Sequence, residues 1–407
     1  MFDLQKALKE LRGLKGRFGD RYRDSKVQEI GCLSPNLPLP PGQMESTRLG
    51  SHYVIRAAYP HDYFHGKVRL SRLSSGDLQC LMTFMREKGH VPERDRIIFL
   101  DTETTGIQGG TGMCPFLVGA GYFAADDFQV VQFFIRDFDE EPSMLLSLRQ
   151  LLEQFDLVIT YNGAAFDIPL LETRFALARI DSAFENMSHF DLLFTTRRLW
   201  RHGHGSCRLT ALEREMISFF RGPDIPGAMI PRVYFDYLRL RTSPALQSVF
   251  KHNVHDVVSL AALTVHACDR VTMEPAELDD PRDLYSLSRV MENSADWRRS
   301  IRLYEMAIAG GLPEPTRRKA LENLSVIYRR AGQHERSRDI CAELMRDPVF
   351  SITAYEGAAI YYERSARDFE AALRVLDDGL ARADTPRCKK RLKARWERLQ
   401  QKVIGYE

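Results

Sequence analysis

Two acidic residues separated by one position follow an apolar segment in the first third of the chain. Asp101 and Glu103 come directly after Arg-Ile-Ile-Phe-Leu at 96–100, a run typical of a buried strand. Alternate residues of a strand face the same side, so we expect both carboxylates to project together. Carboxylates held this close repel one another unless a divalent cation neutralises them. The next residues, Thr104 to Gly106, predict a tight turn whose hydroxyls and backbone a ligand can approach.

A third acidic residue, Asp167, stands at the start of a predicted helix. It ends the segment Asn162-Gly-Ala-Ala-Phe166-Asp167, which follows the apolar segment Leu-Val-Ile-Thr at 157–160. A carboxylate at this place either joins the first two acids in a site or caps the helix. The residues themselves leave both roles open.

A fourth acidic residue, Asp256, lies on a predicted helix beside two histidines. The segment is His252-Asn-Val-His255-Asp256. Because His252 and Asp256 are four residues apart, they share a helical face, whereas His255 points about 100° away. A single histidine on a helix is more often packed or exposed than catalytic, so the spacing to Asp256 is the informative feature.

Together these segments resemble the three motifs of the DEDD (DnaQ-like) exonuclease superfamily, which has the ribonuclease H-like fold. The motifs occur in the right order over about residues 96–268. The resemblance implies 3′→5′ hydrolysis of phosphodiester bonds with two Mg²⁺ or Mn²⁺ ions. The implied ligands are the four carboxylates of Asp101, Glu103, Asp167 and Asp256.

The resemblance also implies roles for residues around the acids. His252 would take the proton of the attacking water as general base. Five residues would contact the terminal nucleotide and its strand: Thr102, Thr104, Gly106, Asn162 and Phe166. For Phe166, packing in the core is an equal alternative.

One feature departs from the superfamily pattern. Its members carry either a tyrosine four positions before the last aspartate or a histidine five positions before it. Here Lys251 is at the fifth position and His252 at the fourth, so a histidine stands at the tyrosine spacing. Helical geometry favours His252 as the general base, and His255 is the alternative.

Two weaker signals lie between the second and third motifs. Asp191 is either a structural acid or part of the site lining. Trp200 has four arginines around it, which suits phosphate binding beside a stacking aromatic ring. A solvated helix end with a buried tryptophan explains this stretch nearly as well. The arginines are Arg197, Arg198, Arg201 and Arg208.

The apolar pattern predicts the elements that position these side chains. We expect strands at 96–100 and 157–160, and a hairpin formed by 116–123 and 129–135. Helical spacing occurs in four segments: 143–155, 168–178, 209–215 and 253–267. A mixed sheet flanked by helices is an α/β arrangement, so residues 96–270 are expected to form a ribonuclease H-like domain.

Two further segments flank this domain. Residues 1–95 are expected to be an N-terminal arm or cap, with a basic amphipathic helix at 1–30 and a Pro-rich linker at 33–43. In residues 283–407, apolar positions recur every 34 residues, which is typical of tetratricopeptide repeats. A plain helical bundle is the alternative.

The last predicted helix, 389–403, is strongly basic. Within 387–402 eight lysines and arginines stand against one glutamate. The helix either caps the repeats with a solvated basic face or binds phosphates.

This organisation resembles the YprB group of bacterial ribonuclease H-like proteins with tetratricopeptide repeats, which includes a mitomycin-repair exonuclease. The likeness also covers Gly109–Gly112, Phe116–Gly119 and Asp224–Gly227. It implies a DNA substrate, a role in DNA repair and a helicase partner bound by the repeats. An RNA-processing exonuclease and a non-catalytic scaffold are the alternatives, and the presence of all four carboxylates argues against the scaffold.

Composition narrows the class of protein further. The 407 residues are 44% hydrophobic and 28% charged with a net charge of +2, which excludes a disordered or fibrous chain. There is neither an apolar run of about 18 residues nor a signal peptide, so we expect a cytoplasmic protein without membrane contact. Seven cysteines without a Cys-x-x-Cys pair predict buried thiols in a reducing compartment, not disulfides or a zinc site.

Overall fold

The computed structural model describes residues 39–404 except positions 61, 74–76, 85–91, 107–111, 126, 204 and 295. The chain divides into two compact units. The first runs to Thr195 and includes Ser206–Asp269, and the second contains Thr196–Gly205 and the chain from Arg270 on. The helix expected at 1–30, the start of the Pro-rich linker and Gly109–Thr111 lie outside the described residues. In the part of the chain that is described, no helix is long and apolar enough to cross a membrane.

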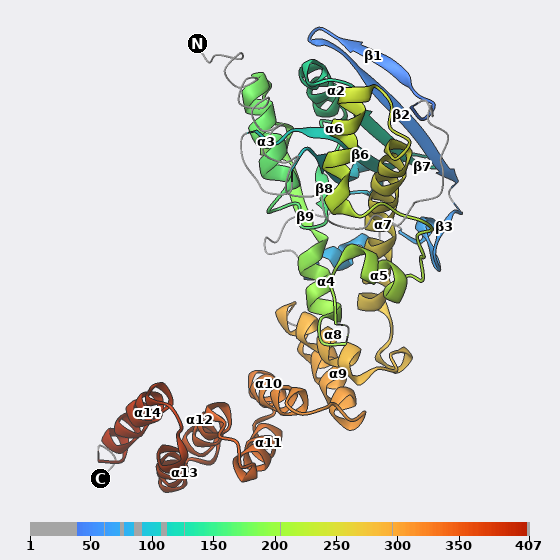
Figure 1. Cartoon of the computed structure of the whole chain (residues 1–407). Coiled ribbons are helices and arrows are strands. Elements are labelled where there is room, and N and C mark those ends of the chain that lie inside the picture. Colours follow the sequence, from blue (N-terminus) through green and yellow to red (C-terminus); the bar gives the residue numbers. More distant parts are fainter. Residues whose placement is uncertain are drawn as a thin grey trace, which may run out of the picture. The chain divides into compact units, whose positions relative to one another are not determined.

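A seven-stranded mixed sheet forms the centre of the first unit (Figure 1). Five neighbouring strands pair antiparallel, and the last two joins, β5 with β8 and β8 with β9, are parallel. The α/β mixed sheet expected from the apolar pattern is confirmed. In spatial order the strands are β1 (Gln43–Thr47), β2 (Gly50–Pro60), β7 (Asp127–Phe134), β6 (Pro115–Phe123), β5 (Ile97–Thr104), β8 (Leu157–Thr160) and β9 (Ser188–Asp191).

The strands β1 and β2 come from the segment expected to be an N-terminal arm or cap at 1–95. Strand β2 pairs with β7, and β1 pairs with β2, so both extend the central sheet, and Val54 of β2 is buried. A small hairpin, β3 (Phe64–His65) with β4 (Val68–Arg69), follows. The described part of this segment thus belongs to the same compact unit as the sheet.

Helices pack around the sheet of the first unit (Figure 1). Four of them match segments with helical spacing, whereas α4 and α6 had not been predicted. The helices are α2 (Glu141–Leu152), α3 (Asp167–Ala178), α4 (Leu192–Trp200), α5 (Leu209–Met216), α6 (Ile230–Leu240) and α7 (Leu246–Thr272). The helix α4 continues into the second unit beyond Thr195, and α7 beyond Asp269.

Helix α7 lies directly on strand β6 because two glycines leave room for it. A Cβ atom at Gly119 would lie 2.2 Å from Asn253 Oδ1 of α7. A Cβ atom at Gly121 would lie 2.5 Å from Val257 Cγ1, one helical turn further on. This close approach brings the third motif of the sequence beside β5, the neighbour of β6 that carries the first motif.

The second unit consists of paired helices followed by a terminal helix. Its helices are α8 (Pro281–Asn293), α9 (Trp297–Ala309), α10 (Thr316–Arg330), α11 (His334–Arg346), α12 (Ile352–Tyr361), α13 (Phe369–Arg382) and α14 (Pro386–Ile404). Each helix packs on its neighbours in the chain, as expected for helical hairpins. The helical character of the C-terminal region is therefore confirmed.

The spacing between the first two hairpins differs from the expected period of 34. In the first, the Ser300 hydroxyl donates to the Ser288 carbonyl at 2.9 Å; in the second, Ser337 donates to Ser325 at 2.7 Å. Each residue of the second pair follows its counterpart by 37 positions. The alignment of apolar columns at 34 was therefore out of register between these two hairpins.

The cysteines correct one expectation. Cys80 and Cys268 form a disulfide, although they are 188 residues apart, because the fold brings their Cα atoms to 5.6 Å. The expectation of thiols throughout was wrong for this pair. It holds for Cys114 and Cys341, which are buried and free.

Candidate metal site

Strand β5 carries the first two acids into a cavity of about 330 Å³. The strand is longer than expected and includes both Asp101 and Glu103, with an irregularity in its pairing to β6 between Glu103 and Thr104. The cavity combines carboxylates with an apolar wall. It is lined by Asp101, Thr102, Glu103, Thr104, Gly106, Met113, Tyr161, Phe166, Asp167, Leu170, Gly227, Ala228, Ile230 and Pro231.

Asp167 joins this cavity from the start of α3. The N-cap of that helix is Phe166, so the carboxylate of Asp167 is not the cap. It accepts a hydrogen bond of 2.6 Å from the Thr102 hydroxyl on β5. This bond ties the second motif to the first and gives Thr102 a partner inside the protein.

Helix α7 adds Asp256 and His252 beside Glu103. One ligand atom from each of these three residues lies within 4.8 Å of the others. The Nε2 atom of His252 is 4.0 Å from Glu103 Oε1 and 3.4 Å from Asp256 Oδ2. The four carboxylates expected to act together are thus joined through Glu103, which belongs to both the cavity and this cluster.

His255, the alternative to His252, faces another environment. Its ring packs edge-on against Phe219 with centroids 5.2 Å apart. Burial and the charge of Arg221 lower the pKa of His255 to about 4. The geometry therefore places His252, and not His255, beside the carboxylates.

Asn253 holds Asp101 in place and was missed in the sequence. Its side-chain amide donates to Asp101 Oδ2 at 2.8 Å, and its oxygen accepts from Gln132 at 2.9 Å. Gln132 thereby fixes which end of the amide faces the carboxylate. A signal was available, since Asn253 is three residues before Asp256 and shares its helical face.

Arg221 is the second residue that sequence reasoning missed. Only 6% of its side chain is exposed, and it forms ion pairs with Glu213, Asp224 and the metal-ligand candidate Asp256. Burial lowers the pKa of Arg221, but hydrogen bonding to Glu213 and the charge of Asp256 raise it more, so the guanidinium keeps its charge. One buried cation therefore faces the acids.

The acids repel one another strongly in the absence of a bound cation. Burial and the charges of neighbouring acids raise the pKa of Asp101 and of Glu103 well above their ordinary values. Burial raises the pKa of Asp167 to about 6. Buried carboxylate oxygens that destabilise one another are a suitable ligand set for Mg²⁺ or Mn²⁺, so these residues fit a divalent cation.

The raised pKa values predict how metal binding depends on pH. In the metal-free fold, an acid with a raised pKa favours folding at low pH, and this contribution is lost as the pH rises through the raised value. For Asp167 the loss falls between its ordinary pKa and about 6. Metal binds the ionised acids, so its affinity increases over the same range. At pH 7.5 saturating Mn²⁺ should raise the melting temperature of the full chain by about 5 °C or more.

The same measurement at pH 5.0 should give a clearly smaller shift. EDTA should reverse the shift at both values. Equal shifts at pH 5.0 and 7.5 would contradict ligation by these acids.

The remaining residues predicted to contact substrate differ in their surroundings. Thr104 and Gly106 line the cavity and are linked by a hydrogen bond from the Thr104 hydroxyl to the Gly106 carbonyl. Phe166 also lines it and is 48% exposed, so it is not a core residue. Asn162 lies outside the lining, with the positive φ of 64° that asparagine tolerates.

Asp191 has a structural role. It is buried, and its carboxylate accepts from the backbone N–H groups of Asn162, Ala164 and Leu193. It does not line the cavity. Asp191 therefore holds the loop that leads into Asp167.

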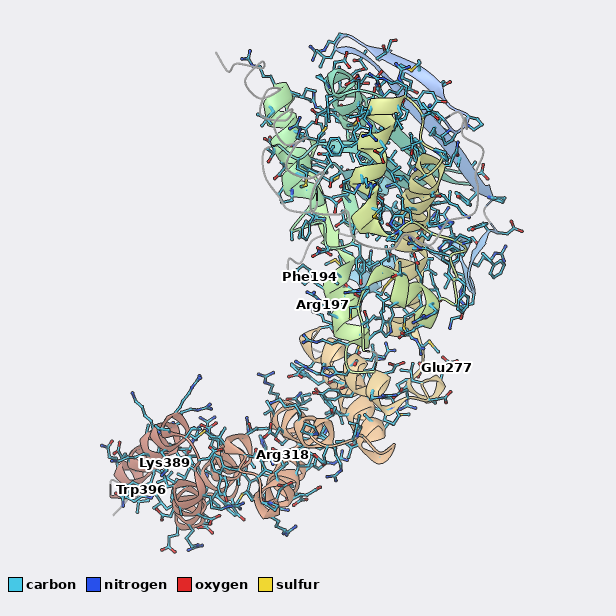
Figure 2. All side chains as sticks on the ribbon, viewed as in Figure 1. Phe194, Arg197, Glu277, Arg318, Lys389 and Trp396 are labelled. Carbon is cyan, nitrogen blue, oxygen red and sulfur yellow. A yellow bond between two sulfur atoms is a disulfide. The ribbon has the colours of Figure 1, made fainter. Side chains whose placement is uncertain are left out.

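The basic stretch around Trp200 is not a stacking platform. Trp200 is 1% exposed, which supports the alternative of a buried tryptophan at a helix end. Figure 2 shows Phe194 and Arg197 on the same helix, α4, and Phe194 is the exposed aromatic residue there.

The first unit is therefore a mixed α/β sheet with a buried acidic site on β5, α3 and α7. Residues 98–268 match the model of the RNase_H superfamily, which supports a ribonuclease H-like domain. The chain is 28% identical to the "Uncharacterized protein YprB" of Bacillus subtilis (strain 168) over 339 residues, 81% of this chain and 80% of that protein.

Among solved structures, part of the chain matches the family B DNA polymerase from the hyperthermophilic archaeon Pyrobaculum calidifontis. The TM-score is 0.35 and the identity 15%, over 55% of this chain. The match spans 30% of the polymerase chain.

Proposed function

We propose that this chain is a metal-dependent 3′→5′ exonuclease of the DEDD type that acts on DNA. The observation that supports the proposal best is the convergence of Asp101, Glu103, Asp167 and Asp256 from three elements, with His252 beside them. The four carboxylates would hold the two ions. When bound, Mg²⁺ or Mn²⁺ neutralises the charge that develops on the phosphate oxygens.

Other residues of the site would transfer the proton, contact the substrate and position the acids. His252 takes the proton of the attacking water at Nε2, the ring atom that faces Glu103 and Asp256. Thr104 and Gly106 line the cavity in which the terminal nucleotide would lie, and the exposed Phe166 offers its ring to a base. Asn253 and Thr102 keep Asp101 and Asp167 in position.

The test is a nuclease assay on the purified full chain. Labelled single- and double-stranded DNA and RNA are offered with Mg²⁺ or Mn²⁺, each with the 3′ or the 5′ end blocked. We expect stepwise shortening of DNA from a free 3′ end, abolished by EDTA. Shortening of RNA alone would instead assign RNA processing, and no hydrolysis of any substrate would support a scaffold.

The second unit would bind a partner and take no part in the chemistry. Its tetratricopeptide-like hairpins would hold a protein such as a helicase, and the two proteins would act together in DNA repair in the cytoplasm. Figure 2 labels Lys389 and Trp396 on the basic helix α14. Part of the positive charge of this helix is neutralised by an acid of the same unit. The buried carboxylate of Glu363 pairs with Arg395, Arg398 and Lys402. These three cations therefore form ion pairs inside the second unit.

Of the other cations of α14, Arg391 pairs with Glu356 and Lys393 lies 3.9 Å from Glu397, and three more lie at the start of the helix. Arg387, Lys389 and Lys390 are exposed. If they meet phosphates, replacing all three by alanine should weaken DNA binding and reduce the slope of log K against log[salt] by up to about 3. Fluorescence anisotropy over a salt series measures both quantities.

The matched control removes three exposed arginines elsewhere in the second unit, Arg298, Arg302 and Arg374. This changes the net charge equally and should leave the slope almost unchanged. Equal effects of the two triple variants would mean that only overall charge matters. No effect of either would favour a purely capping role for α14.

A further inference from the structure

A carboxylate outside the three motifs contacts the imidazole of His252 on the side away from the acids. Its Nδ1 atom lies 2.9 and 3.0 Å from the two carboxylate oxygens of Asp224. Its other nitrogen, Nε2, faces Glu103 and Asp256. The side chain of His252 is 14% exposed, so the ring has few alternative orientations.

The contacts of Nδ1 favour a proton on that ring nitrogen, because the two Asp224 oxygens lie at 2.9 and 3.0 Å, whereas the nearest Arg221 donor, Nη1, lies at 3.4 Å. An ionised carboxylate can only accept hydrogen bonds, so Nδ1 must be the donor. In neutral imidazole the other nitrogen is then the acceptor. When the ring is neutral, the free lone pair of His252 is therefore on Nε2, on the side of Glu103 and Asp256.

Asp224 is itself fixed by two further contacts. Its Oδ2 accepts from the Arg221 guanidinium at 3.1 Å, and its Oδ1 accepts from the Ile225 backbone N–H at 2.9 Å. Burial raises the pKa of Asp224, but hydrogen bonds from His252 and Arg221 lower it more, so the carboxylate stays ionised.

Arg221 connects this pair to a buried anchor. Its Nε donates to Glu213 at 2.7 Å, and Glu213 in turn accepts from the Ser259 hydroxyl at 2.5 Å. The Glu213 side chain is 1% exposed. Arg221 also pairs with Asp256. One guanidinium therefore fixes the positions of both Asp256, the acid of the third motif, and Asp224, which contacts His252.

We propose that Asp224 is a positioning residue that holds His252 as the Nδ1–H tautomer and directs an unprotonated Nε2 to the acids. Arg221 fixes Asp224 for this role. The proposal rests on the nuclease function proposed above, and it gives a task to the Asp224–Gly227 segment that the four carboxylates leave unexplained. A merely structural Asp224 would hold its loop through Arg221 and have no effect through His252.

The first test reads the tautomer directly and needs no activity. Long-range ¹H–¹⁵N spectra of the full chain are recorded at pH 9, well above the ordinary histidine pKa of about 6.5, so that a histidine near that value is neutral. We expect protonated Nδ1 and unprotonated Nε2 for His252. In Asp224→Ala this form should give way to the Nε2–H form or to a mixture. An unchanged tautomer in the variant would overturn the proposal.

The second test is a double-mutant cycle on hydrolysis. Asp224→Ala should lower kcat about 10–100-fold, the range for removing a residue that orients a site histidine, with little change in KM. In a His252→Ala background the same substitution should have no further effect, because Asp224 acts through His252. Additive losses would show a structural role and refute the proposal.

Two controls keep the outcomes distinct. Asp236→Ala removes an acid from the exposed surface of α6 and should leave kcat and the tautomer unchanged. In Asp224→Ala, Arg221 still has its ion pairs with Glu213 and Asp256. The variant should therefore fold, and its melting curve checks this. If the chain has no nuclease activity, the proposed function fails while the spectra still decide the role of Asp224.

Discussion

Replacing Asp101 by asparagine is expected to lower phosphodiester hydrolysis by about 10³-fold or more and to leave the fold intact. Losing a carboxylate ligand removes several kcal/mol of charge stabilisation in the transition state, and each ~1.4 kcal/mol is tenfold in rate. Asparagine keeps an oxygen that can accept the hydrogen bond from Asn253, so the local packing is preserved. Steady-state cleavage of an end-labelled strand measures the loss.

The stability of the same variant separates a ligand from a structural acid. The pKa of Asp101 is raised well above its ordinary value by burial and by neighbouring acids, so its charge destabilises the metal-free fold. The metal-free variant should therefore melt at the same or a higher temperature than the unmodified protein, and the stabilisation by Mn²⁺ should be lost.

The control is Asp236→Asn, which removes an exposed acid from α6 and should change neither rate nor metal response. Asp256 is a less suitable choice, because its removal also takes a partner from buried Arg221. Full activity of Asp101→Asn would exclude the carboxylate mechanism, and a variant that melts much lower without metal would mark Asp101 as a structural residue.

The acids of the site could be predicted because each is marked by its neighbours in the chain. Asp101 and Glu103 come directly after an apolar run that belongs to the same strand, and Asp167 opens a helix with apolar residues at helical spacing. Such signals are local, since the period of a strand or a helix fixes which side chains share a face. The mixed sheet followed from the same patterns.

The residues that orient the acids could not be predicted in this way. Asn253 contacts Asp101 across 152 positions of the chain, and Arg221 contacts Asp256 across 35. Such pairs depend on how α7 and the loop before α6 pack on the sheet, and no periodicity encodes this. Gly119 is an example, because only the packed structure shows that Asn253 occupies the space of a side chain there.

Some misses had other causes. Helix α6 has apolar residues at helical spacing, Ile230, Val233, Tyr234 and Tyr237, so its pattern was present and overlooked. Strand β9 is four residues long and contains two polar residues and a histidine, which is too short for a pattern to decide. The disulfide partners are 188 residues apart, and only the tertiary fold brings them together.

Replacing His252 by alanine is expected to slow hydrolysis by about 10²–10⁴-fold, the usual effect of removing a positioned general base. The physical reason is the place of Nε2, 3.4 Å from Asp256 and 4.0 Å from Glu103, among the acids that would hold the ions. The change should act on kcat, and Mn²⁺ should still stabilise the variant because all four carboxylates remain.

The matched comparison is His255→Ala. It removes an imidazole three positions further along the same helix, on the side that faces Phe219. His255 packs against Phe219, so its loss should lower the melting temperature while activity per folded molecule stays near normal. This pair of variants separates base chemistry from helix packing, because both residues lie on α7 but only one faces the acids. If His255→Ala were inactive and His252→Ala normal, the helical-face assignment would be wrong and the proton acceptor would have to be sought on the Phe219 side.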